Sequence, residues 1–278
     1  MSKTNNKILD RMTEWFEKWL GPVAEFMNTN IYINAIRDAF TIQMPIIIVG
    51  SFALLLNIFI CSKSGLAKYD SLSWLANYSN MFSTINYACI NCMALWTTIL
   101  IAYSLGKRKE LKPEFWAILS AICFLIVSNQ ENIGKNLGAS ALFLSFFVGI
   151  LSIALFSKLM KFDKIKIKLN DAVPPMITNS FNSLIPAAIV LLIFGLCTGV
   201  LYGSTGLYLN DIVYKVIQVP FNQVVGSQLG VSVIIILSQL LWWMGIHGHM
   251  AMNVIAKPVR QAAIAANMEA VATGLIPT

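Results

Sequence analysis

The stretch PAAIVLLIFGLCTGVLYG, residues 186–203, contains no charged side chain and lies inside a longer charge-free run over 172–210. A helix needs about 20 apolar residues to cross the hydrocarbon core of a bilayer. The other charge-free runs are 39–62, 71–106, 115–130, 136–157 and 216–256. All of them except 115–130 also reach that length. The sequence therefore predicts an all-α, polytopic membrane protein.

Composition supports this class, because only 12% of the residues are charged and the mean hydropathy is +0.68. A soluble domain carries roughly 25% charged residues. We expect about six transmembrane helices, of which the third is marginal in length. The predicted spans are 39–60, 81–105, 114–128, 137–157, 176–203 and 231–256.

The basic residues alternate between the two sides of these spans. Sixteen of the 20 Lys and Arg residues fall in the N-terminal segment, the second and fourth connections and the tail. Because positively charged loops stay in the cytoplasm, we expect a cytoplasmic N-terminus. The net charge of +7 then reflects the membrane surface. No run of Lys and Arg with interleaved aromatics indicates nucleic acid as a partner.

Two segments have an amphipathic pattern. Residues 8–23 predict an interfacial helix on the membrane surface, and a helix packed on the rest of the protein fits the same pattern. Residues 204–230 predict an interfacial helix followed by a loop around Pro220, with a re-entrant element as the alternative. The N-terminus lacks the pattern of a signal peptide, so we expect the first span to direct insertion.

Both histidines of the chain, His247 and His249, lie in LLWWMGIHGHM, residues 240–250. Two ligands do not complete a zinc site, so we expect no metal and no other cofactor. A histidine hydrogen-bonded to helix backbone and a histidine that binds a solute are both compatible with the position. Trp242 and Trp243 have faces suited to stacking on sugar rings. The interfacial aromatic belt is the alternative explanation for them.

A second polar stretch lies in NDAVPPMITNSFNSLIPA, residues 170–187. Pro174 and Pro175 open the predicted fifth span, and Pro186 is expected to interrupt it. Between them, four polar side chains occupy two helical turns, Asn179, Ser180, Asn182 and Ser183. They are explained equally by interhelical hydrogen bonds and by a polar face that lines a pathway.

The sequence lacks the motifs by which transporters usually use an ion gradient or ATP. None of the 13 acidic residues lies deep in a predicted span, although ion-coupled carriers usually need such a carboxylate. The sequence contains no phosphate-binding loop for ATP and no potassium selectivity filter. A permease of this kind would depend on a partner protein for its energy.

Together, VPPMITNSFNSLIPA and LLWWMGIHG resemble the lactose/cellobiose/diacetylchitobiose-type enzyme IIC of the bacterial phosphotransferase system. The resemblance runs over nearly the whole chain and includes GKRKELKP, residues 106–113. It implies a homodimeric permease in the bacterial plasma membrane that translocates a disaccharide. A cytoplasmic enzyme IIB, supplied by enzyme IIA, would phosphorylate the sugar. The resemblance implies no phosphoryl-carrying catalytic residue in this chain.

The resemblance also implies a substrate site. His247 corresponds to the histidine that hydrogen-bonds the sugar, and Trp242 to an aromatic wall beside it. Further candidate substrate-binding residues are Trp243, Gly245 and Asn182. The implied domains are a cytoplasmic or interfacial segment (1–38), an N-terminal transmembrane half with the dimer interface (39–170), and an incomplete sugar-translocation half (171–278).

The sequence departs from the family pattern at one point. A Thr-Glu-Pro element, whose glutamate binds sugar in the family, does not occur, and Glu269 does not match it. We therefore expect that the 278 residues do not transport sugar alone. Two hypotheses remain open: a disaccharide permease represented by an incomplete chain, and a non-transporting remnant that inserts and dimerises. An unrelated channel is a more distant third.

Overall fold

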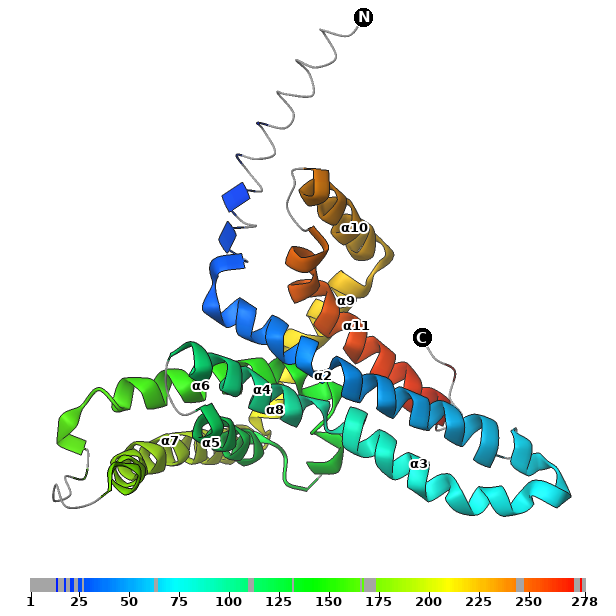
Figure 1. Cartoon of the computed structure of the whole chain (residues 1–278), viewed down its shortest axis with the longest axis horizontal. Helices are drawn as coiled ribbons and strands as arrows, with labels where there is room; N and C mark the ends of the chain where they lie inside the picture. The colour runs from blue at the N-terminus through cyan, green and yellow to red at the C-terminus, as the bar shows by residue number, and fades with distance from the viewer. Residues whose placement is uncertain are drawn as a thin grey trace, which may run out of the picture.

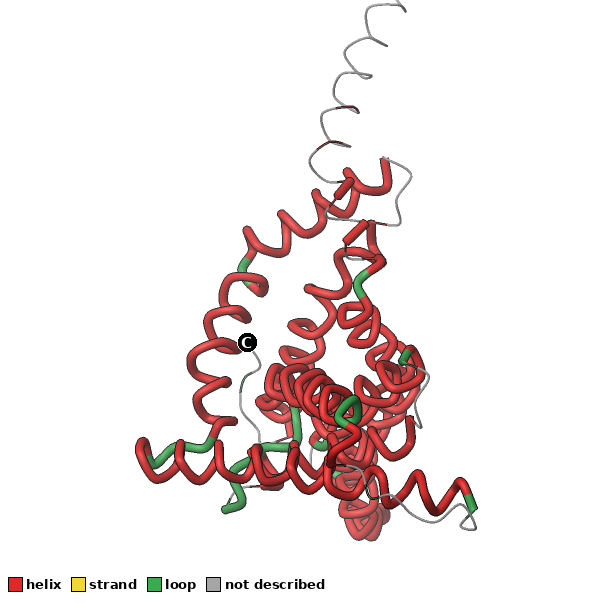
Figure 2. The backbone as a smooth tube through the Cα atoms, turned by 90° about the vertical axis from the view of Figure 1, so that its left-hand side faces the viewer, coloured by secondary structure: helices red, strands yellow, loops and turns green. Residues whose placement is uncertain are grey.

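The computed structural model describes residues 28–62, 65–109, 113–131, 133–165, 174–243 and 248–272, with isolated residues outside these ranges. Within them, all regular secondary structure is helical, as Figure 2 shows. The prediction of an all-α fold is confirmed. Most of the amphipathic segment 8–23 lies outside the described residues, so the prediction of an interfacial helix there stays a prediction.

The described chain contains α-helices linked by short 3₁₀ and π-helical elements. In chain order these are α2 (Ile31–Leu56), η1 (Asn57–Cys61), η2 (Leu66–Lys68), η3 (Asp70–Tyr78), α3 (Ser79–Asn86), η4 (Tyr87–Asn91), α4 (Met93–Arg108), α5 (Pro113–Val127), η5 (Ile133–Lys135), η6 (Ala139–Ala141), α6 (Leu142–Leu159), η7 (Asp163–Ile165), α7 (Pro175–Thr205), α8 (Leu209–Val213), η8 (Tyr214–Gln218), α9 (Val219–Gly226), α10 (Gln228–Trp243) and α11 (Gly248–Ala272).

Figure 1 shows three regions. Helices α2 and α3 form an arm at the right, α4 to α7 lie together at the lower left, and α9 to α11 lie on the upper side of α2. Three helices among the described residues are long and apolar enough to cross a membrane, and up to five if each of two bent pairs counts as one span. The predicted spans 39–60, 137–157 and 176–203 overlap these three, which contain most of α2, α6 and α7. Helix α5 has only 15 residues, as the marginal third run predicted.

The predicted second span, 81–105, is a broken helix. The segments on either side of Cys92 form an angle of 44°. The break is stabilised by groups from elsewhere in the chain: Ala94 donates its N–H to the Leu137 carbonyl at 2.8 Å, and Gln43 of α2 donates to the Met93 carbonyl at 3.1 Å. Backbone groups freed within a membrane need such partners.

The predicted sixth span, 231–256, is wrong as a single helix. Helix α10 ends at Trp243, and α11 begins at Gly248. Figure 1 shows α11 turning back along α10, and the two helices pack against each other. Glycine costs roughly 1 kcal/mol inside a helix, and the sequence has Gly245 and Gly248 at this point. The two glycines therefore weaken the preference for one straight helix at this point. Packing of α11 against α10 is enough to outweigh it.

The loop predicted around Pro220 is also wrong. Elements α8, η8 and α9 form a helical run over 209–226, and Pro220 lies in the first turn of α9, where its missing N–H costs little. The chain then bends by 71° at Ser227 into α10. Such a bent pair is the geometry of a broken span or a re-entrant element, so the re-entrant alternative remains open.

Pro186 does not interrupt its helix. Helix α7 continues from Pro175 to Thr205 with Pro186 inside it. Pro186 has no N–H to donate to the carbonyl of Asn182, four residues earlier. Helices within membranes tolerate such a proline when neighbouring groups compensate.

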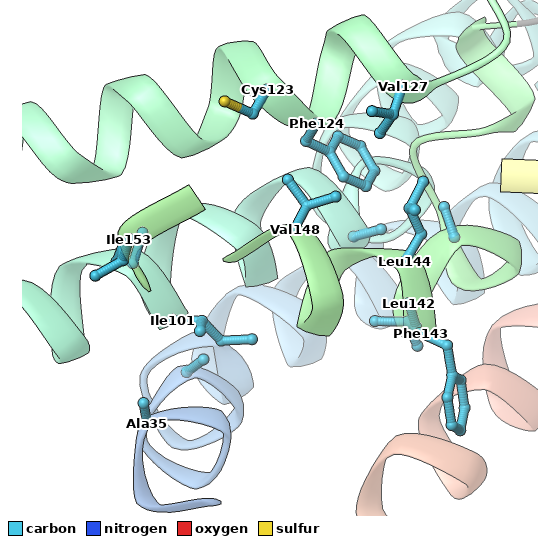
Figure 3. Packing of buried hydrophobic residues seen from close by; sticks show 14 of the residues in the cluster. Ala35, Ile101, Cys123, Phe124, Val127, Leu142, Phe143, Leu144, Val148 and Ile153 are labelled. Atoms are coloured by element: carbon cyan, nitrogen blue, oxygen red, sulfur yellow. The ribbon is translucent and has the colours of Figure 1, made fainter. Parts of the chain in front are cut away.

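The core lies where α2, α4, α5 and α6 meet. Ile101, Phe124 and Leu144 are fully buried there, and Figure 3 shows the α5 and α6 side chains facing one another. The core extends to the later helices through Phe143 of α6, whose ring lies 4.9 Å from that of Phe221 in α9.

One ion pair ties the first helices together. Arg108, at the end of α4, pairs with Asp38 of α2, and the Ser104 hydroxyl donates to the same carboxylate at 2.7 Å. The contact places the end of α4 beside the first turns of α2. An antiparallel pair of this kind fits the alternating distribution of charge along the chain.

Candidate functional site

The predicted sugar-binding motif lies at the junction of α10 and α11. Trp242 is the penultimate residue of α10, and its side chain is half exposed. Trp243 also belongs to α10, but its side chain is outside the described part of the structure. Gly245 and His247 lie in residues 244–247, which are likewise outside it. The assignment of these residues to a sugar site stays a prediction.

Asn182 lies in the second turn of α7, and its side chain is partly buried. Helices α7 and α10 lie far apart in Figure 1, at the bottom and the top of the view. The structure therefore does not bring Asn182 next to Trp242. A single site that contains both residues would require a different arrangement of these helices or a ligand long enough to reach both.

The described residues line an open polar cavity of about 700 Å³ elsewhere, between the N-terminal bundle and the last helices. Ligand-binding clefts typically measure 300–1,000 Å³. The cavity lies where two π-helical elements, η4 and η8, approach the connection between α5 and α6. Its polar lining residues are Tyr87, Asn91, Glu131, Ser140, Tyr214, Gln218 and Asn222, and Ala262 and Ala266 of α11 line another side.

Hydrogen bonds hold part of this lining in place. Gln218 is buried, donates to the Ala139 carbonyl at 2.6 Å and accepts from the Phe143 N–H at 3.5 Å. The Tyr87 hydroxyl donates to the Gly134 carbonyl at 3.2 Å. Asn222 differs, because its buried Oδ1 has no hydrogen-bond partner among the described residues. Buried polar atoms are usually paired, so Asn222 Oδ1 is a candidate acceptor for a ligand.

A second cavity of about 740 Å³ adjoins the first, since Tyr87 and Asn91 line both. It is lined by further polar groups of the arm, Asn57, Ser62, Ser79, Ser83, Thr84 and Asn86. Two of these groups are fixed, because Asn57 donates to the Ser83 hydroxyl at 3.0 Å and Asn86 to the Gly50 carbonyl at 3.0 Å. Polar groups thus continue from the bundle along the arm.

Amides, phenols and hydroxyls both donate and accept hydrogen bonds, as sugar hydroxyls and water do. Apart from the Glu131 carboxylate, the lining is therefore suited to a neutral polyhydroxylated molecule or to a column of water. None of these residues belongs to the two motifs that predicted the sugar site. A signal was present, because Asn91 lies inside the charge-free run 71–106, and Gln218 and Asn222 lie inside 216–256.

Comparison with known proteins gives a consistent result. A family model for the EIIC component of the phosphotransferase system matches residues 37–276. The oligo-beta-mannoside-specific EIIC component of Bacillus subtilis (strain 168) is 26% identical over 276 residues, which are 95% of this chain and 61% of the relative. The cellobiose-specific EIIC component of Geobacillus stearothermophilus is 26% identical over 270 residues, 90% of this chain and 59% of the relative.

A solved structure has the same fold. The crystal structure of ChbC, the IIC component of the N,N'-diacetylchitobiose-specific phosphotransferase system, matches with a TM-score of 0.83 at 25% identity. The match covers 94% of this chain and 64% of ChbC. This chain thus spans about three fifths of the length of the proteins it matches. It is a multi-pass helical membrane protein and belongs to the EIIC family of the phosphotransferase system.

Proposed function

We propose that this chain acts in the membrane component of a phosphoenolpyruvate-dependent phosphotransferase system, where it binds a disaccharide and takes part in its translocation. The observation that carries the proposal is the family match over residues 37–276. The substrate class is supported by relatives named for oligo-beta-mannosides, cellobiose and diacetylchitobiose. Cellobiose and lactose are the first disaccharides to test. The proposed partners are a cytoplasmic enzyme IIB and, through it, enzyme IIA.

The proposed arrangement follows from charge and packing. The N-terminus is cytoplasmic because sixteen of the 20 basic residues fall on that side. Residues 39–170 form the dimerising half, and residues 171–278 contribute to the sugar-translocation half. The close packing of α2, α4, α5 and α6 around one core supports a rigid first half.

In this proposal the sugar is bound at the motif of α10 and α11, with Trp242 stacking on a ring and His247 bonding a hydroxyl. Trp243 and Gly245 are further substrate-binding residues, and Asn182 joins them only in a different arrangement of α7 and α10 or with a ligand long enough to reach both. The polar cavities beside η4 and η8 support a hydrated route between the helices, because irregular backbone and polar side chains persist at membrane depth only where protein or water covers them.

The test is binding of cellobiose and lactose to the purified chain by isothermal titration calorimetry. We expect His247→Ala to abolish binding and Trp242→Ala to weaken it by about 1–3 kcal/mol, by analogy with aromatic stacking on nucleic-acid bases. Trp74→Ala is the matched control, because Trp74 is an exposed tryptophan of η3. Unchanged binding by the His247 variant would contradict the site assignment.

The alternative is a remnant that inserts and dimerises without transport. Uptake of labelled cellobiose distinguishes the two, in cells that supply IIA and IIB, lack their own IIC and express the chain joined to the C-terminal part of a relative, because the 278 residues are not expected to transport sugar alone. Uptake above that of the same cells without the expressed chain supports the permease. A membrane-inserted chain that binds no sugar and co-purifies with a full-length EIIC protein supports the remnant.

A further inference from the structure

Three helix ends meet at one end of the bundle. A Cβ atom added at Gly106, near the end of α4, would lie 3.0 Å from the Cα of Pro113, which begins α5. The ring of Phe156, near the end of α6, lies 5.5 Å from the ring of Phe115 and 5.2 Å from that of Trp116, both in the first turn of α5. These contacts bring the end of α4, the start of α5 and the end of α6 together.

Six basic residues lie at the ends of α4 and α6 or within five residues after them and are here called the basic cluster: Lys107, Arg108, Lys109, Lys158, Lys161 and Lys164. Arg108 pairs with Asp38. The five lysines have no ion-pair partner among the residues that the structure describes. Two further carboxylates lie on the same helix ends, Glu114 and Asp163, so the cations outnumber the carboxylates. The described residues therefore leave an excess of positive charge here.

The positions of Lys109 and Lys161 show that the basic cluster is more than a set of independent, solvated charges. The two lysines follow different helices, yet they lie close enough to interact: burial lowers the pKa of Lys109, and the neighbouring charge of Lys161 lowers it further. Bringing two cations together with one partly desolvated is unfavourable. An anion placed beside both removes that cost.

The surroundings of the cluster favour a lipid over a soluble anion. Two apolar rings lie beside the cations, Phe115 of α5, 37% exposed, and Phe162, which follows α6 and is 54% exposed. Helix α5 has 15 residues, or about 22 Å at roughly 1.5 Å per residue. That is shorter than the ~30 Å hydrocarbon core of a bilayer. The ends of a helix shorter than the hydrocarbon core lie close to the boundary with the headgroups, and the start of α5 adjoins the lysines of the cluster.

We propose that the basic cluster binds the phosphate of an anionic phospholipid, with an acyl chain of that lipid lying along Phe115 and Phe162. The site orders the lipid at the ends of α4, α5 and α6 and lies on the cytoplasmic side in the proposed orientation. This lipid proposal requires that the chain is inserted in a membrane, and it does not require that the chain transports sugar.

The experiment uses the chain of residues 1–278 in detergent, titrated with dioleoylphosphatidylglycerol or dioleoylphosphatidylcholine, with bound lipid counted by native mass spectrometry. We expect tighter retention of phosphatidylglycerol. Each lysine near an anionic surface contributes about fivefold, which corresponds to ~1 kcal/mol. The triple variant Lys109→Gln, Lys158→Gln, Lys161→Gln should therefore lose phosphatidylglycerol about 100-fold more readily, with phosphatidylcholine unchanged.

Two controls make the result decisive. Lys68→Gln with Lys215→Gln removes exposed lysines from η2 and η8, and this pair should retain phosphatidylglycerol like the parent. Lys109→Arg with Lys161→Arg keeps the charge and should also retain it, which separates lost charge from a fold defect. Circular dichroism confirms that each variant is helical.

Three outcomes would overturn the proposal. The first is equal retention of the two lipids by the parent chain, and the second is equal retention of phosphatidylglycerol by the parent and the triple variant. The third is displacement of phosphatidylglycerol by inorganic phosphate at equal concentration, which would assign the cluster to a soluble anion. Phe162→Ser tests the acyl contact and should reduce retention of phosphatidylglycerol severalfold without removing a charge.

Discussion

Gln43 provides a sharp test of how the broken helix is held. Its side chain is fully buried in α2, and its Nε2 donates to the Met93 carbonyl at 3.1 Å. The Thr97 hydroxyl lies 2.8 Å from Gln43 Oε1 and 2.7 Å from the Met93 carbonyl. That hydroxyl has one proton, so it bonds one acceptor at a time. Gln43 thus joins α2 to the start of α4 through up to two hydrogen bonds.

The substitution Gln43→Met keeps the length of the side chain and removes both bonds. An interhelical hydrogen bond within a membrane contributes about 0.6 kcal/mol on average and at most ~1.7. After the substitution, Thr97 still bonds the Met93 carbonyl, so part of the loss is recovered. We expect Gln43→Met to lower the free energy of unfolding by about 1 kcal/mol, and Thr97→Val by somewhat less.

The assay is reversible unfolding in mixed micelles of mild detergent and dodecyl sulfate, followed by circular dichroism. Met44→Leu is the matched control, because Met44 is the exposed neighbour of Gln43 on α2. In a double-mutant cycle, Gln43→Met and Thr97→Val should show a coupling of about 0.6 kcal/mol. Strictly additive effects, or a Gln43→Met variant as stable as Met44→Leu, would refute the proposed role of this contact.

Two further predictions concern the packing of neighbouring helices. Gly50→Ala should destabilise the fold by about 1–3 kcal/mol, because the new Cβ would lie 2.6 Å from Cys89 Cβ. Gly199→Ala is the control, because its new Cβ meets nothing within 4 Å, and it should be neutral or slightly stabilising. Thermal unfolding in detergent measures both variants. Equal melting temperatures for Gly50→Ala and Gly199→Ala would contradict the α2–η4 contact. The buried hydroxyls of Ser120 and Ser152 lie 2.6 Å apart, and Ser152 also donates to a carbonyl of its own helix. Ser152→Ala leaves the buried Ser120 hydroxyl unpaired and should lower the free energy of unfolding by about 1–3 kcal/mol. Ser120→Ala should lower it by less, because Ser152 keeps its bond to its own helix. The reverse order would show that Ser120 has another partner.

The sequence predicted the helical class well because lipid imposes a simple rule. Every backbone group inside the bilayer must be paired within the chain, so an apolar run without charges forms a helix. That rule located α2, α6 and α7 and indicated the short length of α5. The sugar-binding residues were proposed from motif resemblance, and the structure leaves Gly245 and His247 outside its described residues.

Breaks and turns could not be predicted in the same way. A straight helix over 231–256 and two helices packed side by side have the same residues and the same hydropathy, so only packing between α10 and α11 distinguishes them. The polar cavity was missed for a related reason. Asn91 is far in sequence from Gln218 and Asn222, and only the tertiary contacts of η4 with η8 and α9 place all three residues around one cavity.

The sequence by itself determined that the chain is an all-helical membrane protein, which runs of it are apolar enough to cross the bilayer, and which segments between those runs are rich in Lys and Arg. These properties depend on local transfer free energies and on the count of charges. Only the tertiary structure decided where a span breaks, which polar side chains share a cavity, and that the ends of α4, α5 and α6 bring lysines of distant segments together. Those features depend on contacts between residues remote in sequence, which no local pattern encodes.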